Sequence, residues 1–266
     1  MPKGTKIFDR LPDHHLDLVK FMEDHELSVF TVEQMSGLTG ISSPHINEIL
    51  ENLALKKMID RLERGKYCRY GFRNDKVIGS FLTGGGSIAY WSALNYHLMT
   101  EQIPNVVFVQ SPRYKQSKSI FNVRYKFVKI LDPKFFGIIQ TGYGRDSFPI
   151  TDKEKTLIDC FEYPEYSGGY SELIRAFAAS NLNPDKLVDY GKRTNNLAVL
   201  KRIAFLSEIL DMRGYQRFRK MTAVRLNERY ALFDPMGPNE GEFVSAWRLR
   251  LNITRNQIIE IAQNLS

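Results

Sequence analysis

The chain has 266 residues, of which 43% are hydrophobic and 25% are charged, and its formal net charge at pH 7 is +7. This length predicts two domains, and the hydrophobic share is enough to give each domain a buried core. No apolar stretch approaches the roughly 18 residues that span a membrane, and no signal peptide is recognisable, so we expect a cytoplasmic protein with no membrane partner. The two cysteines, Cys68 and Cys160, are far apart and form no CxxC pair, so neither a disulfide framework nor a zinc site is expected.

The net charge is unevenly distributed along the sequence. Residues 54–78 carry 8 basic and 3 acidic side chains, while the 53 residues before them carry 4 basic and 9 acidic ones. Residues 79–266 hold 25 basic and 18 acidic side chains, so the whole surplus lies there, concentrated in 113–134 and 213–229. Such a surplus suits a nucleic acid or an acidic protein partner. The alternative is a basic surface that only contacts solvent.

The sequence pattern of the N-terminal third predicts three helices. An amphipathic helix is expected over Leu11–Asp24. Thr31 can then cap a short helix with Val32, Met35 and Leu38 at helical spacing, and Gly40 supplies the turn into the next helix. In that next helix Ser43 is the expected cap and Pro44 the first helical residue. Its apolar residues recur at i, i+3, i+4 and i+7 and should be buried: Ile46, Ile49, Leu50 and Leu53. Its outward residues are expected to be Ser42, Ser43, His45, Asn47 and Glu51.

Two short strands, Met58–Ile59 and Tyr67–Tyr70, follow the helices and are joined by a turn at Glu63–Lys66. Together with the helices, this hairpin predicts a winged helix-turn-helix that binds duplex DNA. The second helix would enter the major groove and the basic hairpin would reach phosphates or a minor groove. The candidate DNA-contacting residues are Ser42, Ser43, His45, Asn47, Lys56, Arg61, Arg64, Lys66 and Arg69.

Two alternatives to DNA binding stay open for this region. The charged hairpin could be merely solvated, and many winged helices contact protein without touching DNA. Glu48 and Glu51 lie on the expected reading helix, where each would face a polyanion. The first domain is expected to end near Val77, followed by a short linker within Phe72–Gly84, which gives domains 1–78 and 79–266.

The sequence pattern of the second domain predicts a sheet followed by helices. Gly84–Ser87 is expected to open a helix that runs to about Met99, and a phosphate-binding loop is disfavoured because the GxxxxGK[ST] spacing is absent. Strands are expected over 106–110, 120–130, 138–141 and 147–150. A capping box at Thr151–Glu154 predicts the next helix, with Leu157, Ile158 and Phe161 on its buried face. Further helices are expected over 171–180, 184–190 and 195–210, then a strand around 243–251 and a last helix from Thr254. A sheet followed by helices is typical of an α+β domain.

Several segments of the second domain resemble a known family. The segments Ser87–Leu94 (SIAYWSAL) and Thr100–Pro104 (TEQIP), the second leading into Val106–Val109, resemble the signature of AbiEi-family antitoxins. The same likeness is found in Ile150–Cys160, Pro164–Gly169, Asn196–Arg202 and the Leu232–Pro235 turn with Trp247. The resemblance covers nearly the whole chain, including the N-terminal winged helix with its RGKYCR hairpin.

The resemblance implies an antitoxin of a type IV toxin–antitoxin system, encoded in anti-phage loci beside a nucleotidyltransferase-like toxin. The winged helix would repress the shared operon by binding inverted repeats in its own promoter, and residues 79–266 would neutralise the toxin, directly or functionally. The DNA-contacting positions that carry over are Ser43, His45, Asn47, Arg64, Lys66 and Arg69. The reading helix holds less arginine than family members often show. Candidate partner-binding residues in the basic segments are Arg113, Lys115, Lys118, Arg217, Arg219 and Lys220.

Two other classes of function were compared with the antitoxin. A nuclease needs two or three carboxylates around a metal ion; the nearest approach is Asp132 with Glu154 and Lys155, and the capping role of Glu154 already accounts for one of these. The histidines show no ligand spacing: His14, His15, His25, His45 and His97. We therefore expect no catalysis, no metal and no cofactor. A ligand-responsive regulator without a toxin is the other alternative, since 13 Tyr and 17 Phe could line a pocket, although aromatic residues more often form the core.

Overall fold

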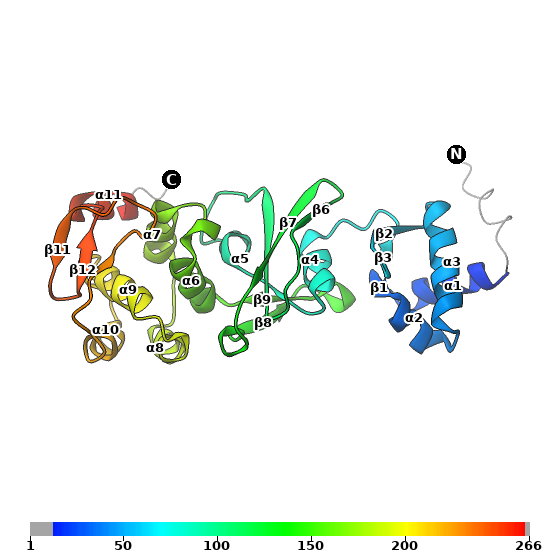
Figure 1. The fold of residues 1–266 in the computed structure, drawn as a ribbon, viewed down its shortest axis with the longest axis horizontal. Coiled ribbons are helices and arrows are strands. Elements are labelled where there is room, and N and C mark those ends of the chain that lie inside the picture. Colours follow the sequence, from blue (N-terminus) through cyan, green and yellow to red (C-terminus); the bar gives the residue numbers. More distant parts are fainter. Residues whose placement is uncertain (1–12, 264–266) are drawn as a thin grey trace. The chain divides into compact units, whose positions relative to one another are not determined.

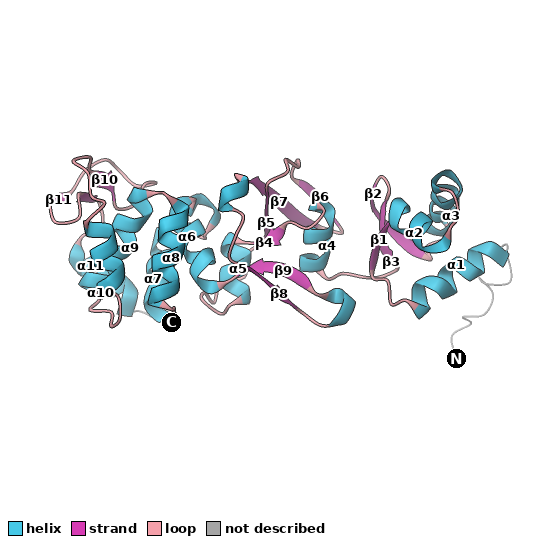
Figure 2. Ribbon diagram, turned by 90° about the horizontal axis from the view of Figure 1, so that it is seen from below, coloured by secondary structure: helices cyan, strands magenta, loops and turns pink. Residues whose placement is uncertain are grey.

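The computed structural model describes residues 13–263 and contains two units of mixed helix and sheet (Figures 1 and 2). Unit 1 comprises Met1–Gly84 and Gly142–Phe148, and unit 2 comprises Gly85–Thr141 and Pro149–Ser266. The mixture of helices and sheets agrees with the predicted α+β class. The first two residues of the helix predicted over 11–24 lie outside the described residues.

Unit 1 combines helices with a small antiparallel sheet. Its helices are α1 (Asp13–Asp24), α2 (Val32–Thr39), α3 (Ser43–Leu55) and α4 (Asp75–Thr83). Its strands β1 (Val29–Thr31), β2 (Ile59–Glu63) and β3 (Lys66–Arg69) are arranged in the order β1-β3-β2. The predicted helices and the predicted hairpin are therefore present, with β2 one residue later and three residues longer than expected. The unit also includes a short 3-10 turn, η3 (Gly144–Asp146).

Capping residues determine where α2 begins and ends. The Thr31 hydroxyl accepts a hydrogen bond from the Gln34 N–H, and the Gln34 side chain accepts one from the Thr31 N–H, which forms a capping box. Gly40 ends the helix with a φ of 74°, which a residue with a side chain rarely adopts. The predicted cap and turn are confirmed. Leu38 is 54% exposed, however, so the predicted apolar face of this helix ends at Met35.

The apolar stripe of α3 is buried as predicted. Its four residues are each at most 1% exposed and pack with Phe30, Met35 and Tyr67 in the core of unit 1: Ile46, Ile49, Leu50 and Leu53. The predicted cap is wrong by one residue. Ser42 caps the helix without a side-chain hydrogen bond, so Ser43 is the first helical residue.

The segment expected to link the domains forms helix α4 instead. Asn74 caps it by accepting a hydrogen bond from the Val77 N–H at 3.2 Å, and Gly84 ends it with a φ of 70°. Val77 and Leu82 are at most 4% exposed. Because α4 packs within unit 1, the border between the units falls after residue 84 rather than after residue 78. Gly79 lowers the helix propensity of this segment, which is why it resembles a linker in the sequence.

A six-stranded mixed sheet forms one part of unit 2. Its strands are β4 (Ser87–Ile88), β5 (Val106–Ser111), β6 (Lys118–Ile120), β7 (Val123–Lys129), β8 (Ile138–Thr141) and β9 (Phe148–Thr151), in the order β6-β7-β5-β4-β9-β8. Strand β5 pairs in parallel with β7, and β4 pairs in parallel with β9. The β4–β5 and β6–β7 pairs are antiparallel. The strands predicted near residues 106, 138 and 147 are confirmed.

Two predictions about this sheet are wrong. Residues 84–87 do not open a long helix, because Ser87 belongs to β4 and the following helix α5 runs only over Tyr90–Tyr96. The single strand predicted over 120–130 is broken at Phe121 and Asn122, whose φ values of 50° and 65° form the turn between β6 and β7. Neither turn residue is a glycine, so the sequence lacks the usual signal of a tight turn.

Helices follow the sheet, as predicted, and cover most of the remaining chain. They are α6 (Lys153–Glu162), α7 (Tyr170–Ala179), α8 (Pro184–Thr194), α9 (Leu197–Ile209), α10 (Gln216–Ala223) and α11 (Arg255–Gln263). Leu157, Phe161 and Phe205 lie at the centre of their shared core. The one strand expected around 243–251 is instead a small sheet of order β10-β12-β11, made of β10 (Ala231–Leu232), β11 (Glu242–Val244) and β12 (Leu249–Leu251).

The start of α6 differs from the predicted capping box. Thr151 belongs to β9, and Asp152 is the cap, with its carboxylate accepting a hydrogen bond from the Lys155 N–H. Glu154 does not reach back to the cap. Its carboxylate accepts a hydrogen bond from the Asn183 N–H at 2.8 Å and pairs with Lys186 at 3.2 Å, which joins α6 to α8.

Candidate nucleic-acid interface

The N-terminal end of α3 presents polar side chains to solvent. Ser42, Ser43 and His45 are exposed and Asn47 is half-buried, while Ile46 is completely buried in the core of unit 1. This arrangement follows from the helical repeat, because the apolar stripe fixes which side of α3 faces outward. The structure therefore brings the four predicted helix residues together at one end of one helix.

Three of the predicted basic residues are exposed and unpaired. Lys56 follows the last residue of α3, Arg61 lies on β2, and Arg64 lies in the turn between β2 and β3. Within residues 13–263, none of these three side chains makes an ion pair or a hydrogen bond. No internal contact has to break before these charges can meet a phosphate.

Lys66 differs from its neighbours on the hairpin because its ammonium group is already bound. Its Nζ donates to the backbone carbonyl of Leu82 at 2.7 Å and lies 3.2 Å from the carboxylate of Glu63. The same ammonium lies 5.6 Å from the centre of the Phe81 ring. Carbonyl groups at the C-terminal end of a helix attract a cation. Lys66 therefore attaches β3 to the last turn of α4, and its predicted contact with DNA would require these interactions to be given up.

Arg69 lies at the other end of β3 from the hairpin turn. Its backbone pairs with Ile59 at the start of β2, and its N–H donates to the Ser28 carbonyl at 3.0 Å. Its side chain lines a pocket formed with α1 and with residues 143–146. The structure thus separates Arg69 from Arg64, although the sequence places both on one hairpin.

The acidic residues of α3 lie close to the predicted basic ones. His45 Nδ1 lies 3.7 Å from the carboxylate of Glu48. Glu51 and Arg61 line one shallow depression together with Leu55, which is 82% exposed. These carboxylates reduce the positive potential along α3, so attraction to phosphate in unit 1 depends chiefly on the unpaired basic residues.

A second group of charged residues in unit 1 was not predicted from the sequence. Glu23 and Glu26 at the end of α1, together with Arg145 and Asp146 of η3, line the pocket that also contains Arg69. The only sequence pattern close to these residues is the turn at Gly142–Gly144. It predicts a loop, but it does not predict which residues of α1 that loop approaches. Their proximity results from the tertiary fold.

Both cysteines are buried and unpaired. Burial is the main reason that the pKa of the Cys68 thiol is raised, to about 12, and the nearby Asp60 carboxylate acts in the same direction. Burial likewise raises the pKa of Cys160 well above its ordinary value. Because the reactive form of cysteine is the thiolate, both side chains are packing residues.

The two basic segments of unit 2 occupy different elements, in both views at opposite ends of the unit (Figures 1 and 2). The first, which we call the basic loop, precedes or opens β6 and consists of Arg113, Lys115 and Lys118. The second, which we call the basic helix, lies on α10 and consists of Arg217, Arg219 and Lys220. The structure does not bring the two sets together.

The basic residues also differ in their existing contacts. In the basic loop, Lys115 Nζ lies 5.7 Å from the centre of the Phe127 ring. In the basic helix, Arg217 pairs with Asp185 at 2.8 Å and Arg219 donates to the Ser207 carbonyl at 3.1 Å. Lys220 is exposed. The basic helix lines a shallow groove together with Glu208 and Trp247.

Two of the three residues that approach a nuclease pattern, Glu154 and Lys155, are occupied by structural interactions. Asp132 is exposed at a 3-10 turn, and Glu154 joins α6 to α8 as described above. Lys155 forms a buried ion pair with Asp159 one turn along α6, and its ammonium lies 4.8 Å from the centre of the Phe136 ring. Burial raises the pKa of the Asp159 carboxyl to about 6, while Lys155 acts in the opposite direction. In residues 13–263, no three His, Cys, Asp or Glu side chains are grouped so that they could hold a metal ion.

None of the helices in the described part of the chain has the length and apolar character needed to cross a membrane. No protein-family model matches the chain, and no curated protein matches its sequence. Among solved structures, the chain is similar to the crystal structure of the RV2827C protein from Mycobacterium tuberculosis, with a TM-score of 0.63 and 15% sequence identity. The similarity covers 95% of this chain and 95% of that chain. At this level of identity the two proteins share their fold over nearly the full length.

Proposed function

We propose that unit 1 is a winged helix-turn-helix that binds duplex DNA, with the N-terminal end of α3 in the major groove. The observation that carries this proposal is the outward polar end of α3, close in sequence to basic residues that make no ion pair or side-chain hydrogen bond within residues 13–263. A helix of this kind reads bases with residues near its N-terminus. Asn47 can pair with adenine through its amide, and His45 can donate to a guanine or a phosphate.

The phosphate contacts in this proposal come from Lys56, Arg61 and Arg64. All three are exposed cations, and phosphate contacts of this type hold a protein in register on DNA without reading its sequence. Lys66 is left out of this set because its ammonium is bound to α4 and Glu63. Arg69 reaches DNA only if its guanidinium turns away from the pocket it lines.

We further propose that the protein is an antitoxin that represses its own operon. The support is the resemblance of the SIAYWSAL, TEQIP and later segments to AbiEi-family antitoxins. In this proposal unit 1 binds inverted repeats in the promoter, and unit 2 opposes a nucleotidyltransferase-like toxin encoded beside it. The basic loop and the basic helix are the candidate contact surfaces for the toxin. A ligand-responsive regulator without a toxin is the second candidate, and the pocket in unit 1 favours it.

The DNA-binding proposal is tested by measuring the affinity of the full chain for its own promoter and for random DNA of equal length. Replacing Asn47 with Ala should cost roughly 1–3 kcal/mol on the promoter and little on random DNA. Asn52→Ala provides a matched control, because it makes the same change about 140° further around α3. Equal losses on both DNAs would assign Asn47 a positioning role only. Equal affinity of the unmodified chain for both DNAs would refute an operator-specific repressor.

The antitoxin proposal is tested in cells that express the neighbouring toxin gene. Co-expression of the full chain should restore growth, and a chain carrying Arg64→Ala with Asn47→Ala should still restore it while losing repression of a promoter reporter. Failure of the unmodified chain to restore growth would refute the antitoxin role and leave the DNA-binding proposal intact. Loss of both activities in the double variant would refute the assignment of the two activities to different units.

A further inference from the structure

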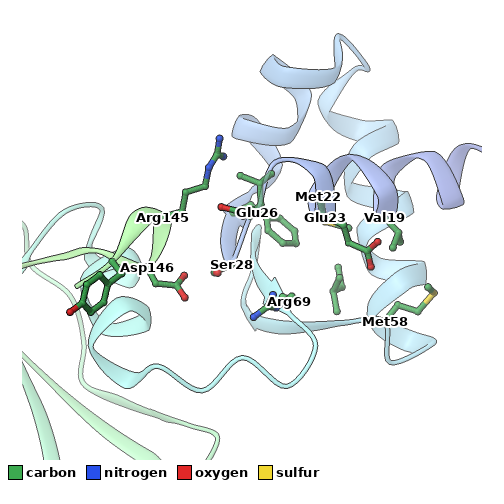
Figure 3. Close-up of a pocket in the computed structure, with 14 residues that line it drawn as sticks. Val19, Met22, Glu23, Glu26, Ser28, Met58, Arg69, Arg145 and Asp146 are labelled. Atoms are coloured by element: carbon green, nitrogen blue, oxygen red, sulfur yellow. The ribbon is translucent and has the colours of Figure 1, made fainter. Parts of the chain in front are cut away.

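Unit 1 contains a pocket of about 430 Å³ on the side of α1 (Figure 3). The walls are formed by the end of α1, the first residues of β1, the start of β2, Arg69 and the loop that contains η3. All of these residues belong to unit 1. The volume falls within the range of roughly 300–1,000 Å³ that is typical of small-molecule sites.

The floor of this pocket is apolar. It includes Met22, Phe30 and Ile59, which are 7%, 1% and 3% exposed and belong to the core of unit 1. Val19 of α1 and Met58 before β2 extend the same surface. A ligand with an apolar group would place that group against these side chains, which is favourable in proportion to the apolar area removed from water.

Five charged side chains surround the apolar floor of the pocket. They come from three segments: Glu23 at the end of α1 and Glu26 in the turn after it, Arg69 on β3, and Arg145 and Asp146 on η3. Within residues 13–263, none of the five side chains makes an ion pair or a side-chain hydrogen bond. Figure 3 shows Arg145 and Asp146 on the loop and Glu23 and Val19 on the other side of the pocket.

Asp146 gives the clearest sign of a missing partner. Its Oδ1 atom is removed from solvent and has no hydrogen-bond partner. A buried carboxylate oxygen without a partner loses the hydrogen bonds that water would supply, which is costly.

We propose that this pocket binds a small zwitterionic molecule with an apolar group, of the size of an apolar α-amino acid. Carboxylates and guanidinium groups are present together in one pocket, so a ligand that carries one ammonium and one carboxylate group satisfies both kinds of charge. An arginine can bind a carboxylate through two parallel hydrogen bonds. The apolar group of the ligand would cover the floor formed by Met22 and Phe30. This site does not depend on DNA binding by unit 1.

The test is isothermal titration calorimetry of the full chain without DNA, using L-tryptophan, L-phenylalanine and L-leucine as probes. At least one of them should bind with one site per chain. Its affinity should exceed that of analogues with one feature removed by at least tenfold, since a lost charge-assisted hydrogen bond costs about 1.5–3 kcal/mol. For tryptophan the analogues are tryptamine, which lacks the carboxylate, and indole-3-propionate, which lacks the ammonium group. Glycine lacks the apolar group in every comparison.

Variants connect the binding to this pocket. Glu26→Gln keeps the shape of the side chain and removes its charge, and Arg145→Gln removes the guanidinium group; each should weaken binding at least tenfold. Glu33→Gln makes the same change at an exposed carboxylate on α2, outside the pocket, and should leave the affinity unchanged. Thermal unfolding of each variant checks that the chain is folded. No binding of any probe, equal binding of tryptamine and tryptophan, or equal affinity in all three variants would overturn the proposal. Because no DNA is present, these outcomes are independent of the proposed DNA binding.

Discussion

Two basic residues of the hairpin, Arg64 and Lys66, are only two positions apart, and the structure predicts opposite consequences for their replacement. Arg64 is exposed at the turn and has no partner within residues 13–263. The ammonium of Lys66 is bound to the Leu82 carbonyl and to Glu63, and its side chain is only 23% exposed. We therefore expect Arg64→Ala to act on DNA affinity and Lys66→Met to act on the stability of unit 1.

The size of each effect can be estimated. Loss of one phosphate contact lowers the slope of log affinity against log salt concentration by about 0.9. Between 50 and 200 mM salt, the advantage of the unmodified chain over Arg64→Ala should then shrink by about 3.5-fold. Lys66→Met should leave the slope unchanged. It should instead reduce the free energy of unfolding by about 1.5–3 kcal/mol, because hydrogen bonds from a charged donor are lost.

Fluorescence anisotropy with labelled promoter DNA measures the slope, and urea denaturation measures the stability. Lys20→Met serves as a control, because it removes one exposed positive charge of unit 1 on α1, outside the hairpin. A change of slope for Lys66→Met equal to that for Arg64→Ala would refute the reasoning, since it would place the Lys66 ammonium on DNA rather than on α4. An unchanged slope for Arg64→Ala would remove the hairpin turn from the interface.

Three further predictions follow from other parts of the molecule. Lys155→Met leaves the buried Asp159 without its counter-charge. Denaturation at pH 7 should show a free energy of unfolding lower by about 3–5 kcal/mol. A loss below about 1 kcal/mol would contradict a stabilising role for the Lys155–Asp159 ion pair. The pKa of the Asp159 carboxyl is raised, so the folded state holds the Asp159 proton more tightly than the unfolded state. The stability that the protonated carboxyl gives should therefore be lost as pH rises through about 6, and Asp159→Asn should remove this pH dependence. In one variant the charges of the basic loop are reversed, and in a second variant those of the basic helix. One of these two variants should lose toxin neutralisation, measured as growth of cells that express the toxin. Full rescue of growth by both variants would mean that the surplus charge only contacts solvent.

The parts of the fold that the sequence predicted are those that depend on local chemistry. The stripe of α3 repeats at helical spacing, Thr31 carries the hydroxyl that a cap requires, and Gly40 lacks the side chain that would strain a left-handed turn. Where two local interpretations compete, the sequence was misleading. Thr151 and Asp152 both resemble a helix cap, and pairing of β9 in the sheet decided between them.

Other features depend on contacts between distant residues. The turn at Phe121 and Asn122 has no glycine, and Gly79 interrupts the helical pattern of α4, although Asn74 and Gly84 carry the usual signals of its two ends. The candidate interface on α3 was predicted because it lies within one helix. The internal contacts of Lys66, and the pocket that Arg145 lines, arise from residues far apart in the chain, and no local pattern encodes them.

The division of the chain has a consequence for recombination. Unit 1 is built from Met1–Gly84 and Gly142–Phe148, so the chain passes from one unit to the other three times. A single crossover at residue 84 between two related genes would combine the helices of one parent with the η3 loop of the other. Arg145 and Asp146 would then come from one parent gene, and the Glu23 and Glu26 of the same pocket from the other. Exchange of a complete unit 1 requires two separate segments to move together, so chimaeras made at one junction should keep their helices yet lose a matched pocket.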